Sequence, residues 1–380
     1  MRAALDDLRI VELAAIGPVP YGVMLLADLG AEVIRVDRVA AAQGRPGAEA
    51  SMVGLSRNRR SVAVDLKQPD GVEVVRRLAR SADVVVEGFR PGVAERLGIG
   101  PEELRSDHPG LIYARVTGWG QDGPLAPRAG HDLDYAAVAG ALHGIGEADR
   151  PPPPPINYLA DFAGGGAFLA IGVLAALVER RHSGEGQVLD VAMVDGAASL
   201  TAFLHGLRQL GAWSLERSSN LLDGASPFYR SYRCADGRFV AVAALEPQFH
   251  AALCRALGLD PAAWPQHDPA RWPEQTEALA QLFATRDRDA WVAMLEDDDT
   301  CVAPVLDLEE APTHPHNQAR GTFVEAFGAV QPAPAPRLSR TPGAIDRPPP
   351  GFGEHTDEVL ASLGYGPDDL KRLRSAGAIA

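Results

Sequence analysis

The chain has 380 residues, of which 46% are hydrophobic and 23% are charged, and its formal net charge at pH 7 is -14. This length is sufficient for a large core and for two domains, and the composition is ordinary for a soluble globular protein. The acidic balance argues against a nucleic-acid-binding protein, which would have to neutralise phosphates, but it allows a local basic pocket for a phosphorylated small molecule.

The cysteine content and the amino terminus indicate a cytoplasmic protein. Three widely spaced cysteines, Cys234, Cys254 and Cys301, form no C-x-x-C pair, so a disulfide framework is not expected. The first ten residues, MRAALDDLRI, contain no apolar run of the kind found in signal peptides. The most apolar window, residues 163–181, ends in a charge cluster. It is too short for a comfortable membrane span and predicts a buried helix.

The first 120 residues predict alternating strands and helices. Strands are expected over 8–13, 31–37, 61–66, 82–89 and 110–120, and helices over 20–30 and 69–80. Repeated units of this kind give a mostly parallel sheet with helices on both faces. The loop AAIGPVPYG after the first strand lacks G-x-G-x-x-G, which favours a plain strand–helix–strand unit over a dinucleotide site.

The remainder of the chain changes character after a proline connector. After PPPPP (151–155), we expect a helix over about 163–182, a strand over 186–195, a helix over 195–212, a hairpin over 229–245 and two amphipathic helices over 247–259 and 272–287. The sequence therefore predicts an α/β protein with a large domain (1–220), a smaller α+β domain (221–310) and a proline-rich segment (311–380) that returns to the large domain.

His131, in GHDLDY, is the first candidate for chemistry. A histidine titrates near neutral pH and can act as either base or acid, although a surface or hydrogen-bonded histidine explains the stretch equally well. Asp132 and Asp134 precede helical spacing, which is typical of helix-capping acids.

Asp161, in DFAGGG, is the second candidate. An acid before a helix is an ordinary N-cap, but three glycines at 164–166 weaken a helix start. Close approach of a ligand to bare backbone would offset that cost. A helix amino terminus could then offer N–H groups to a developing oxyanion.

Other polar residues leave two interpretations open. Glu246 precedes a proline at an expected helix start, where a first-turn acid is favourable. Basic residues in 55–67, with Arg38 and Arg90 near strand ends, predict either an anionic ligand at the strand termini or a solvated charge run. The sequence contains no G-x-S-x-G, H-E-x-x-H or P-loop, which argues against serine hydrolase, zincin and nucleotidase functions.

Taken together, the motifs resemble the class III CoA-transferase superfamily and, within it, the α-methylacyl-CoA racemases. The resemblance covers nearly the whole chain, and the matching motifs occur in the family order: LRIVELAAIGPVPYGVMLLADLGAEVIRVDR, RNRRSVAVDLK, VVVEGFRPGVAERLGIGPEEL, LIYARVTGWGQDGP, GHDLDYAAVAGALHGIG, DFAGGGAFLAIGVLAAL, GQVLDVAMVDG, YRCADGRFVAVAALEPQF and LSRT. It implies a Rossmann-like large domain and a small domain in an interlocked homodimer, with the active site between domains of different subunits.

The resemblance also implies roles for individual residues. His131 and Asp161 would be opposing acid/base groups, and Glu246 would orient the histidine. The residues implied to contact the CoA portion or to lie near the thioester are Arg38, Arg59, Lys67, Gly88, Arg90, Asp132 and Tyr135. Whether Arg57, Arg59 or Arg60 makes the basic contact is left open.

The implied reaction inverts the α-carbon of 2-methylacyl-CoA thioesters by two-base proton transfer through an enolate. It needs no metal or other cofactor, since CoA is part of the substrate, and neither nucleic acid nor membrane is an expected partner. The segment 199–213 has no methionine, whereas the racemases line their acyl surface with it, so the acyl chain is left open. The alternatives are a CoA transferase with Asp161 as nucleophile and a non-catalytic acyl-CoA binder.

Overall fold

The computed structural model describes residues 3–45, 47–296 and 299–380. The chain divides into two compact units, one of Met1–Ala139, Pro154–Thr201 and Gly321–Ala380, the other of Gly140–Pro153 and Ala202–Arg320. These borders differ from the expected ranges, because residues 140–153, 202–220 and 311–320 belong to the second unit. Hydrogen bonds join the first two of these segments, since Arg217 donates to the carbonyls of Ile145 and Arg150.

The first unit contains the expected parallel sheet. Its six strands lie in the order β3-β2-β1-β4-β5-β6, with bounds β1 Arg9–Leu13, β2 Glu32–Asp37, β3 Arg59–Ala63, β4 Val84–Glu87, β5 Ile112–Thr117 and β6 Val188–Ala192. All five pairings are parallel. The α/β fold class is therefore confirmed, and the strand order reverses direction between β1 and β4, where such sheets form a crevice.

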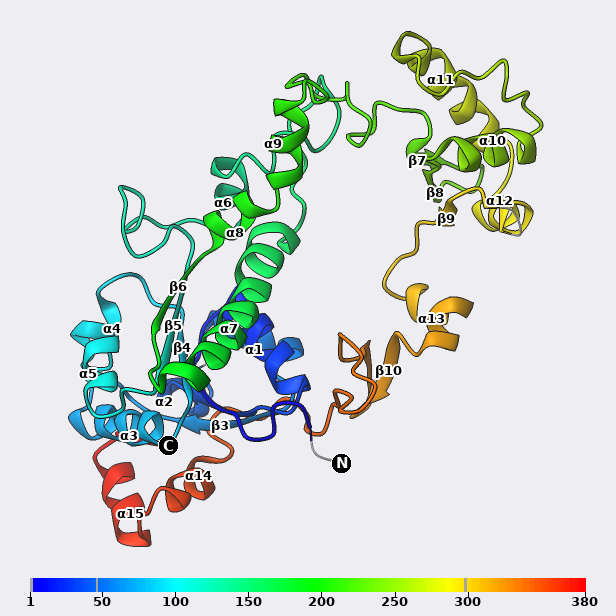
Figure 1. Cartoon of the computed structure of the whole chain (residues 1–380). Coiled ribbons are helices and arrows are strands. Elements are labelled where there is room, and N and C mark those ends of the chain that lie inside the picture. Colours follow the sequence, from blue (N-terminus) through cyan, green and yellow to red (C-terminus); the bar gives the residue numbers. More distant parts are fainter. Residues whose placement is uncertain (1–2, 46, 297–298) are drawn as a thin grey trace. The chain divides into compact units, whose positions relative to one another are not determined.

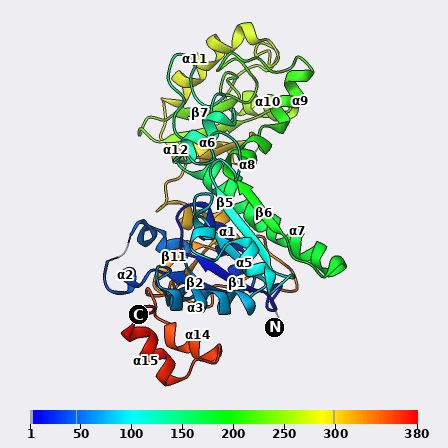
Figure 2. The ribbon, with the colours of Figure 1, turned by 90° about the vertical axis from the view of Figure 1, so that its left-hand side faces the viewer.

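Helices cover both faces of this sheet (Figures 1 and 2). Alternate side chains of each strand point to opposite faces, so Ile10 packs in one core cluster and its neighbour Val11 in the other. One cluster includes side chains of α1 (Pro18–Asp28) and α7 (Phe168–Ser183). The other includes side chains of α3 (Pro69–Arg80), α4 (Val93–Arg96), α5 (Pro101–Ser106), α14 (Thr356–Ser362) and α15 (Pro367–Ser375).

The helix expected from about residue 163 begins earlier. A π-helical segment, η2 (Tyr158–Ala167), leads directly into α7. The expected helix over 195–212 is divided into α8 (Met193–Ser199) and α9 (Ala202–Gln209). The other short elements of the first unit are α2 (Val39–Ala42), a 3-10 helix η1 (Ala48–Leu55) and α6 (Asp132–Val138).

The carboxyl-terminal segment packs against the start of the chain. After the hairpin of β10 (Phe323–Ala326) and β11 (Ala329–Pro332), α14 and α15 lie near α3 in Figure 1. An antiparallel bridge pairs Val64 with Ile379, and the Ala380 amide donates to the Ala63 carbonyl. The last residues of the chain therefore lie beside the end of β3 and pair with it.

The second unit is the small α+β body expected from the sequence, although with different borders. Its antiparallel sheet joins β7 (Tyr229–Arg233), β8 (Phe239–Ala243) and β9 (Val302–Pro304). Its helices are α9, α10 (Pro247–Ala256), η3 (Pro269–Arg271), α11 (Trp272–Phe283), α12 (Arg288–Leu295), η4 (Ala311–Thr313) and α13 (Pro315–Arg320). Phe228, Phe283 and Trp291 are buried in its core.

One helical stretch in the described part of the chain, Tyr158–Ser183, has the length and composition of a membrane span. It has 26 residues, and its most apolar 18-residue window has a mean hydropathy of 1.9 and is 39% buried. The prediction that it is too short was wrong, because η2 and α7 are continuous. A core helix also meets these criteria, and Leu169 and Val173 of this stretch are buried in the sheet core.

Candidate active site

A cavity of about 530 Å³ lies at the carboxyl ends of the central strands. Three lining segments follow directly from strands: 14–19 follows β1, 88–91 follows β4 and 117–119 lies at the end of β5. The cavity is therefore at the point where the strand order reverses, which is the usual ligand position in open α/β sheets. His131 and Asp161 both line it.

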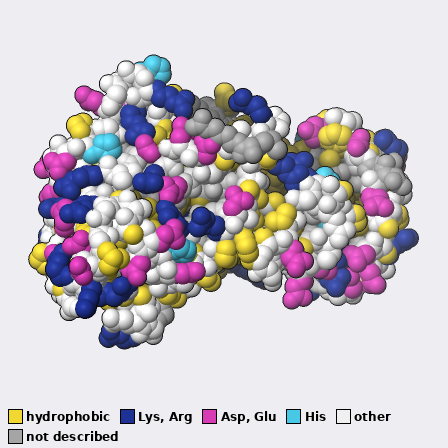
Figure 3. All heavy atoms as spheres, turned by 90° about the horizontal axis from the view of Figure 1, so that it is seen from below, with side chains coloured by type: hydrophobic (Ala, Val, Ile, Leu, Met, Phe, Trp, Pro, Cys, Tyr) yellow, Lys and Arg dark blue, Asp and Glu magenta, His cyan; other side chains and the backbone are white. Residues whose placement is uncertain are grey.

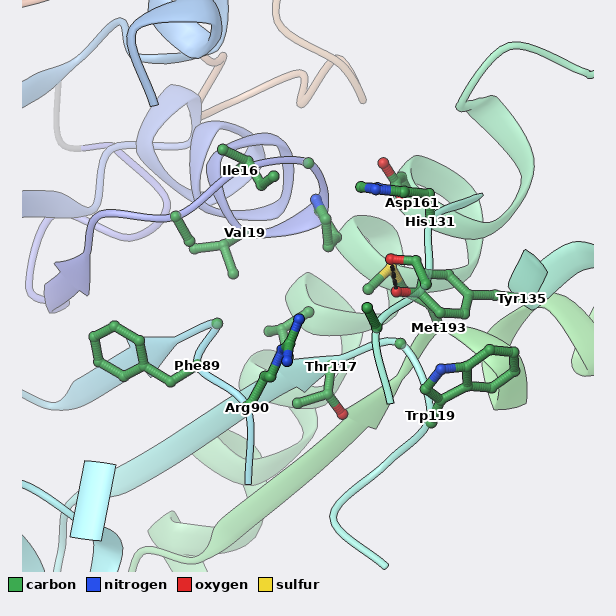
Figure 4. Close-up of a pocket in the computed structure, with 18 of the residues that line it drawn as sticks. Ile16, Val19, Phe89, Arg90, Thr117, Trp119, His131, Tyr135, Asp161 and Met193 are labelled. Atoms are coloured by element: carbon green, nitrogen blue, oxygen red, sulfur yellow. Dashed lines mark hydrogen bonds between the residues drawn. The ribbon is translucent and has the colours of Figure 1, made fainter. Parts of the chain in front are cut away.

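His131 occupies the N-cap position of α6. Its backbone N–H donates to Asp134 Oδ2 at 2.9 Å, which anchors the turn that carries the imidazole. The side chain itself is exposed, and Figure 4 shows it in the same part of the cavity as Asp161. The imidazole is thus held at a helix start while its ring remains accessible.

Asp161 is half-buried in the first turn of η2. Burial raises the pKa of its carboxyl to about 6, and the charge of Asp132 adds to this, whereas Asn157 and His131 act in the opposite direction. Asn157 Nδ2 lies 3.5 Å from Asp161 Oδ2. A Cβ at Gly17, where φ is +68°, would lie 3.0 Å from that oxygen. A carboxyl with this pKa can accept or donate a proton near neutral pH.

Asp132 does not cap its own helix, so that sequence prediction was wrong. It is 5% exposed, and its Oδ1 accepts the backbone N–H groups of Ala160 and Asp161, both at 2.7 Å. The side chain is directed to a segment 28 and 29 residues away. Local spacing could not reveal this contact.

The glycine run does not line the cavity, so the expected ligand contact there was also wrong. Gly164, Gly165 and Gly166 are buried, and none belongs to the cavity wall. An added Cβ at Gly164 would lie 2.8 Å from the Ala197 amide of α8, and one at Gly166 would lie 2.8 Å from the Pro18 carbonyl of α1. The glycines allow close packing of three helical segments.

Tyr135 forms part of the cavity wall. It is 6% exposed, its hydroxyl donates to the Gly130 carbonyl, and its ring meets Trp119 edge-on at 4.8 Å. Burial, with the charges of Asp161 and Asp134, raises the pKa of its phenol to about 12. Tyr135 is therefore a neutral hydrogen-bonding and packing group, not a proton acceptor at neutral pH.

Most of the basic residues implied to contact CoA lie at the carboxyl ends of strands. Arg38 directly follows β2, Lys67 lies four residues beyond β3, and Gly88 and Arg90 follow β4. All four are exposed, and Gly88 and Arg90 line the cavity. Arg90 projects toward it in Figure 4. These residues are therefore distributed along one edge of the sheet.

Arg59, by contrast, is enclosed in the protein. It is 1% exposed; its Nε pairs with Glu12 at 2.5 Å, and its terminal nitrogens donate to Glu12 and to the carbonyls of Pro20, Leu55 and Arg57. All five N–H groups of a guanidinium are thereby used. The expected CoA contact of Arg59 therefore disagrees with the described structure, because no donor is left for a ligand.

Neither neighbouring arginine replaces Arg59 at the cavity. Arg57 is 3% exposed and pairs with Asp28 at 2.6 Å, and Arg60 forms ion pairs with Glu32 and Glu358. None of the three arginines belongs to the cavity wall.

Glu246 lies in the second unit, where it is the N-cap residue of α10 and is exposed. It forms no side-chain capping hydrogen bond. The structure thus brings His131, Asp161, Tyr135, Gly88 and Arg90 to the wall of the first unit's cavity. Asp132 is buried outside that wall and bonds the Asp161 amide, and Glu246 belongs to the second unit.

Sequence reasoning missed several residues of the wall. Arg128, Asn157, Trp119 and Met52 line the cavity, and Met52 Sδ accepts the Gly17 amide at 3.4 Å. Trp119 follows the end of β5, so its position could have been inferred from the strand; the others lie in loops or η1. No group of three or more His, Cys, Asp or Glu side chains able to hold a metal occurs in residues 3–45, 47–296 and 299–380.

On the face shown in Figure 3, basic and acidic side chains are interspersed. Arg90 and Arg128 are the basic residues of the cavity wall.

Residues 5–356 match the model of CoA-transferase family III, and the chain belongs to that family. It is 45% identical over 374 residues to the α-methylacyl-CoA racemase of Mus musculus, covering 98% of this chain and 96% of the relative. It is 44% identical over 375 residues to the human α-methylacyl-CoA racemase, with the same coverage.

More distant relatives include transferases. A succinyl-CoA–D-citramalate CoA-transferase of Chloroflexus aurantiacus is 32% identical over 397 residues, covering 99% of this chain and 98% of the relative. Among solved structures, a CaiB/BaiF family protein from Brucella suis superposes with a TM-score of 0.83 at 28% identity, covering 96% of this chain and 100% of that one.

Proposed function

We propose that this chain is a racemase that inverts the α-carbon of 2-methylacyl-CoA thioesters. One observation carries the proposal: a single cavity holds both His131 and Asp161, in a chain 45% identical to an α-methylacyl-CoA racemase. An imidazole and a carboxyl whose pKa is raised to about 6 can exchange protons with a weakly acidic carbon near neutral pH.

The chemistry requires two groups of this kind. Inversion removes the α-proton from one face and returns a proton to the other, so one group accepts while the opposite group donates. In one direction Asp161 is the base and His131 the acid, and the roles reverse in the other. Since the glycine run is buried elsewhere, we assign stabilisation of the enolate oxygen to the amino end of α6, where His131 and Asp132 lie.

The CoA portion is proposed to bind along the strand ends of the first unit. Arg38, Lys67 and Arg90 supply positive charge for phosphates. Gly88 leaves the backbone open to close approach, and Tyr135 supports the thioester end of the cavity. Arg59 is withdrawn from this set because its guanidinium is fully engaged within the protein.

The assembly proposed is a cytoplasmic homodimer that needs no cofactor beyond the CoA carried by the substrate. Large apolar side chains are exposed on α7, on α9 and directly after α9, including Ile171 (58%), Phe203 (62%) and Leu210 (82%). Such exposure is typical of a protein interface. In the dimer, Glu246 of one subunit would orient His131 of the other. Size-exclusion chromatography with light scattering checks this, and a stable monomer would contradict it.

The deciding experiment uses one epimer of a 2-methylacyl-CoA in deuterated water. Exchange at the α-carbon with loss of optical purity, and without an added acceptor acid, is the expected result. Acyl transfer to a free carboxylate without exchange would overturn the proposal.

His131→Ala and Asp161→Ala are each expected to lower racemisation by roughly 10²–10⁴-fold, while CoA binding and the folded state remain. His182→Ala and Asp122→Ala are matched controls, because both side chains are exposed and lie outside the cavity wall. Full activity of either cavity variant would remove that residue from the mechanism.

A CoA transferase is the second candidate, favoured by the 32% identity to the Chloroflexus aurantiacus CoA-transferase. Asp161 would then attack the acyl carbon, the thioester C–S bond would break, and a mixed anhydride would form as CoA leaves as its thiolate. Hydroxylamine trapping distinguishes the two, because only the transferase gives a hydroxamate derived from the Asp161 side chain.

A further inference from the structure

We infer that Asp132 is a positioning residue that fixes the separation between His131 and Asp161. The inference rests on the proposed function, and it concerns a role in that reaction for a carboxylate outside the proposed acid/base pair.

The geometry carries the first step. Asp132 directly follows His131 in the chain, and its Oδ1 accepts the N–H groups of Ala160 and Asp161 at 2.7 Å each. The first N–H groups of a helix have no partner within the helix, so an external acceptor decides how that turn is held. Charge-assisted hydrogen bonds of this length are the strong kind.

Among the described residues, the other hydrogen bonds to His131 or Asp161 do not join the elements that carry them. Asn157 reaches Asp161 only at 3.5 Å, and the capping bond of Asp134 engages His131 alone. The path through Asp132 runs from the His131 peptide, through one short side chain, to the Asp161 amide. A displacement of α6 relative to η2 would therefore strain these bonds, so the two groups are held as one rigid pair.

The same carboxylate also has an electrostatic effect. Asp132 Oδ2 is buried and receives no hydrogen bond from the described part of the protein. The charge of Asp132 raises the pKa of Asp161, in addition to the larger effect of burial. Two further ionisable groups lie on elements that pack against η2. His131, at the start of α6, lowers the pKa of Asp161. Asp195, on α8, is exposed to solvent.

Asp134 of α6 and the cavity residues Arg90 and Arg128 are not among the groups that shift the pKa of Asp161. Two further titratable neighbours are tyrosines. Tyr135 of α6 has a pKa raised to about 12, so it carries no charge near neutral pH. Tyr21 of α1 stacks on Phe162 of η2, and the first turn of α1 has no acidic residue. Asp132 is therefore the residue whose charge can be removed with a defined effect on Asp161.

Two substitutions of Asp132 distinguish its effect on the position of Asp161 from its effect on the pKa of Asp161. Asp132→Asn keeps an oxygen able to accept both N–H groups but removes the charge. We expect kcat within about tenfold of wild type and the acid limb of the kcat/KM profile shifted to lower pH. Asp132→Ala removes the acceptor, and we expect kcat to fall by roughly 10²-fold, as for a misplaced reacting group.

Asp195→Asn is the matched control, because it removes one exposed charge from the neighbouring helix α8. Asp195 is not among the groups that shift the pKa of Asp161, so the acid limb is expected to stay where it is in wild type. An acid limb unmoved in Asp132→Asn, or wild-type kcat in Asp132→Ala, overturns the inference.

A second readout does not depend on activity. In the full chain labelled with ¹³C at the aspartate carboxyl carbon, the Asp161 signal is assigned by its loss in Asp161→Asn. Its titration midpoint is expected near 6 in wild type and lower in Asp132→Asn, and an unchanged midpoint overturns the electrostatic part. Absence of α-deuteration by wild type would defeat the proposed function, whereas exchange by wild type with unaltered variants would defeat only the role of Asp132.

Discussion

Arginines at the two ends of the parallel strands have opposite environments. Arg59, the first residue of β3, is 1% exposed and engaged with Glu12 and three backbone carbonyls. Arg90, beyond the end of β4, is exposed and lines the cavity. Arg57, Arg59 and Arg60, the arginines of the basic cluster that suggested an anion site, are thus ion-paired within the protein, whereas Lys67 of the same cluster is exposed. We therefore propose that position at the carboxyl end of a strand, rather than local density of charge, identifies the residues on the ligand side.

The largest expected effect is on folding. Arg59→Met should lower the free energy of unfolding by about 3–5 kcal/mol, because it leaves Glu12 buried without its partner. Arg90→Met should leave that free energy within about 0.5 kcal/mol of wild type, as for an exposed position. Urea denaturation measures both. Equal decreases in unfolding free energy for Arg59→Met and Arg90→Met would contradict the proposed difference between a buried structural arginine and an exposed cavity arginine.

Glu87, the last residue of β4, provides a buried counterpart to the exposed Arg90 three residues further along the chain. It is fully buried, binds Arg115 at 3.0 Å and accepts the Phe89 amide, and burial raises the pKa of its carboxyl to about 7. Because the folded state binds this proton more tightly than the unfolded state, Glu87 makes stability fall as pH rises from about 4.5 to about 7. Above about pH 7, Glu87 is ionised in the folded state, and its full destabilising effect is present.

Glu87→Gln should therefore remove a pH-dependent cost on the order of 1–3 kcal/mol. The measurement is the difference in unfolding free energy between variant and wild type from pH 4.5 to 8. The difference is expected to change steadily in the variant's favour as pH rises, and a constant difference would show that Glu87 does not titrate in this range.

The third effect is on binding. Arg90→Ala should weaken CoA binding about tenfold, equivalent to about 1.4 kcal/mol, and the loss should shrink at high salt because exposed charges are screened. Isothermal titration calorimetry at two salt concentrations checks this. An unchanged dissociation constant would mean that the cavity arginine does not contact CoA.

The smallest effect is expected for Arg60, whose environment is intermediate. Its side chain is 15% exposed and pairs with Glu32 and with the largely exposed Glu358. Pairs of this kind contribute less than about 1 kcal/mol. Arg60→Met should therefore cost little stability and should not alter CoA binding in the same two assays.

The sequence predicted what depends on local pattern. Buried parallel strands appear as continuous apolar runs, so β4 and β5 were located within a few residues, and α3 was predicted with the bounds it has in the structure. His131 and Asp161 were identified as candidates from residue type and resemblance, and the structure places both at one cavity.

What failed depends on contacts between distant residues. Asp132 was expected to cap its own helix but binds an amide 29 residues away. Arg59 meets Glu12 across 47 residues. The glycine run serves packing against α1 and α8. In each case, the local residue pattern fits two roles, and only the tertiary fold selects one.

The bridge between Val64 and Ile379 affects how the chain matures during translation. Strands β1 to β6 leave the ribosome first, but Val64, directly after β3, gains this partner only after residues 202–320, nearly all of the second unit, have been made. Domains tend to fold as they emerge, so the inserted body can complete its core before this contact forms. The end of β3 therefore lacks its carboxyl-terminal partner for most of the synthesis of the chain.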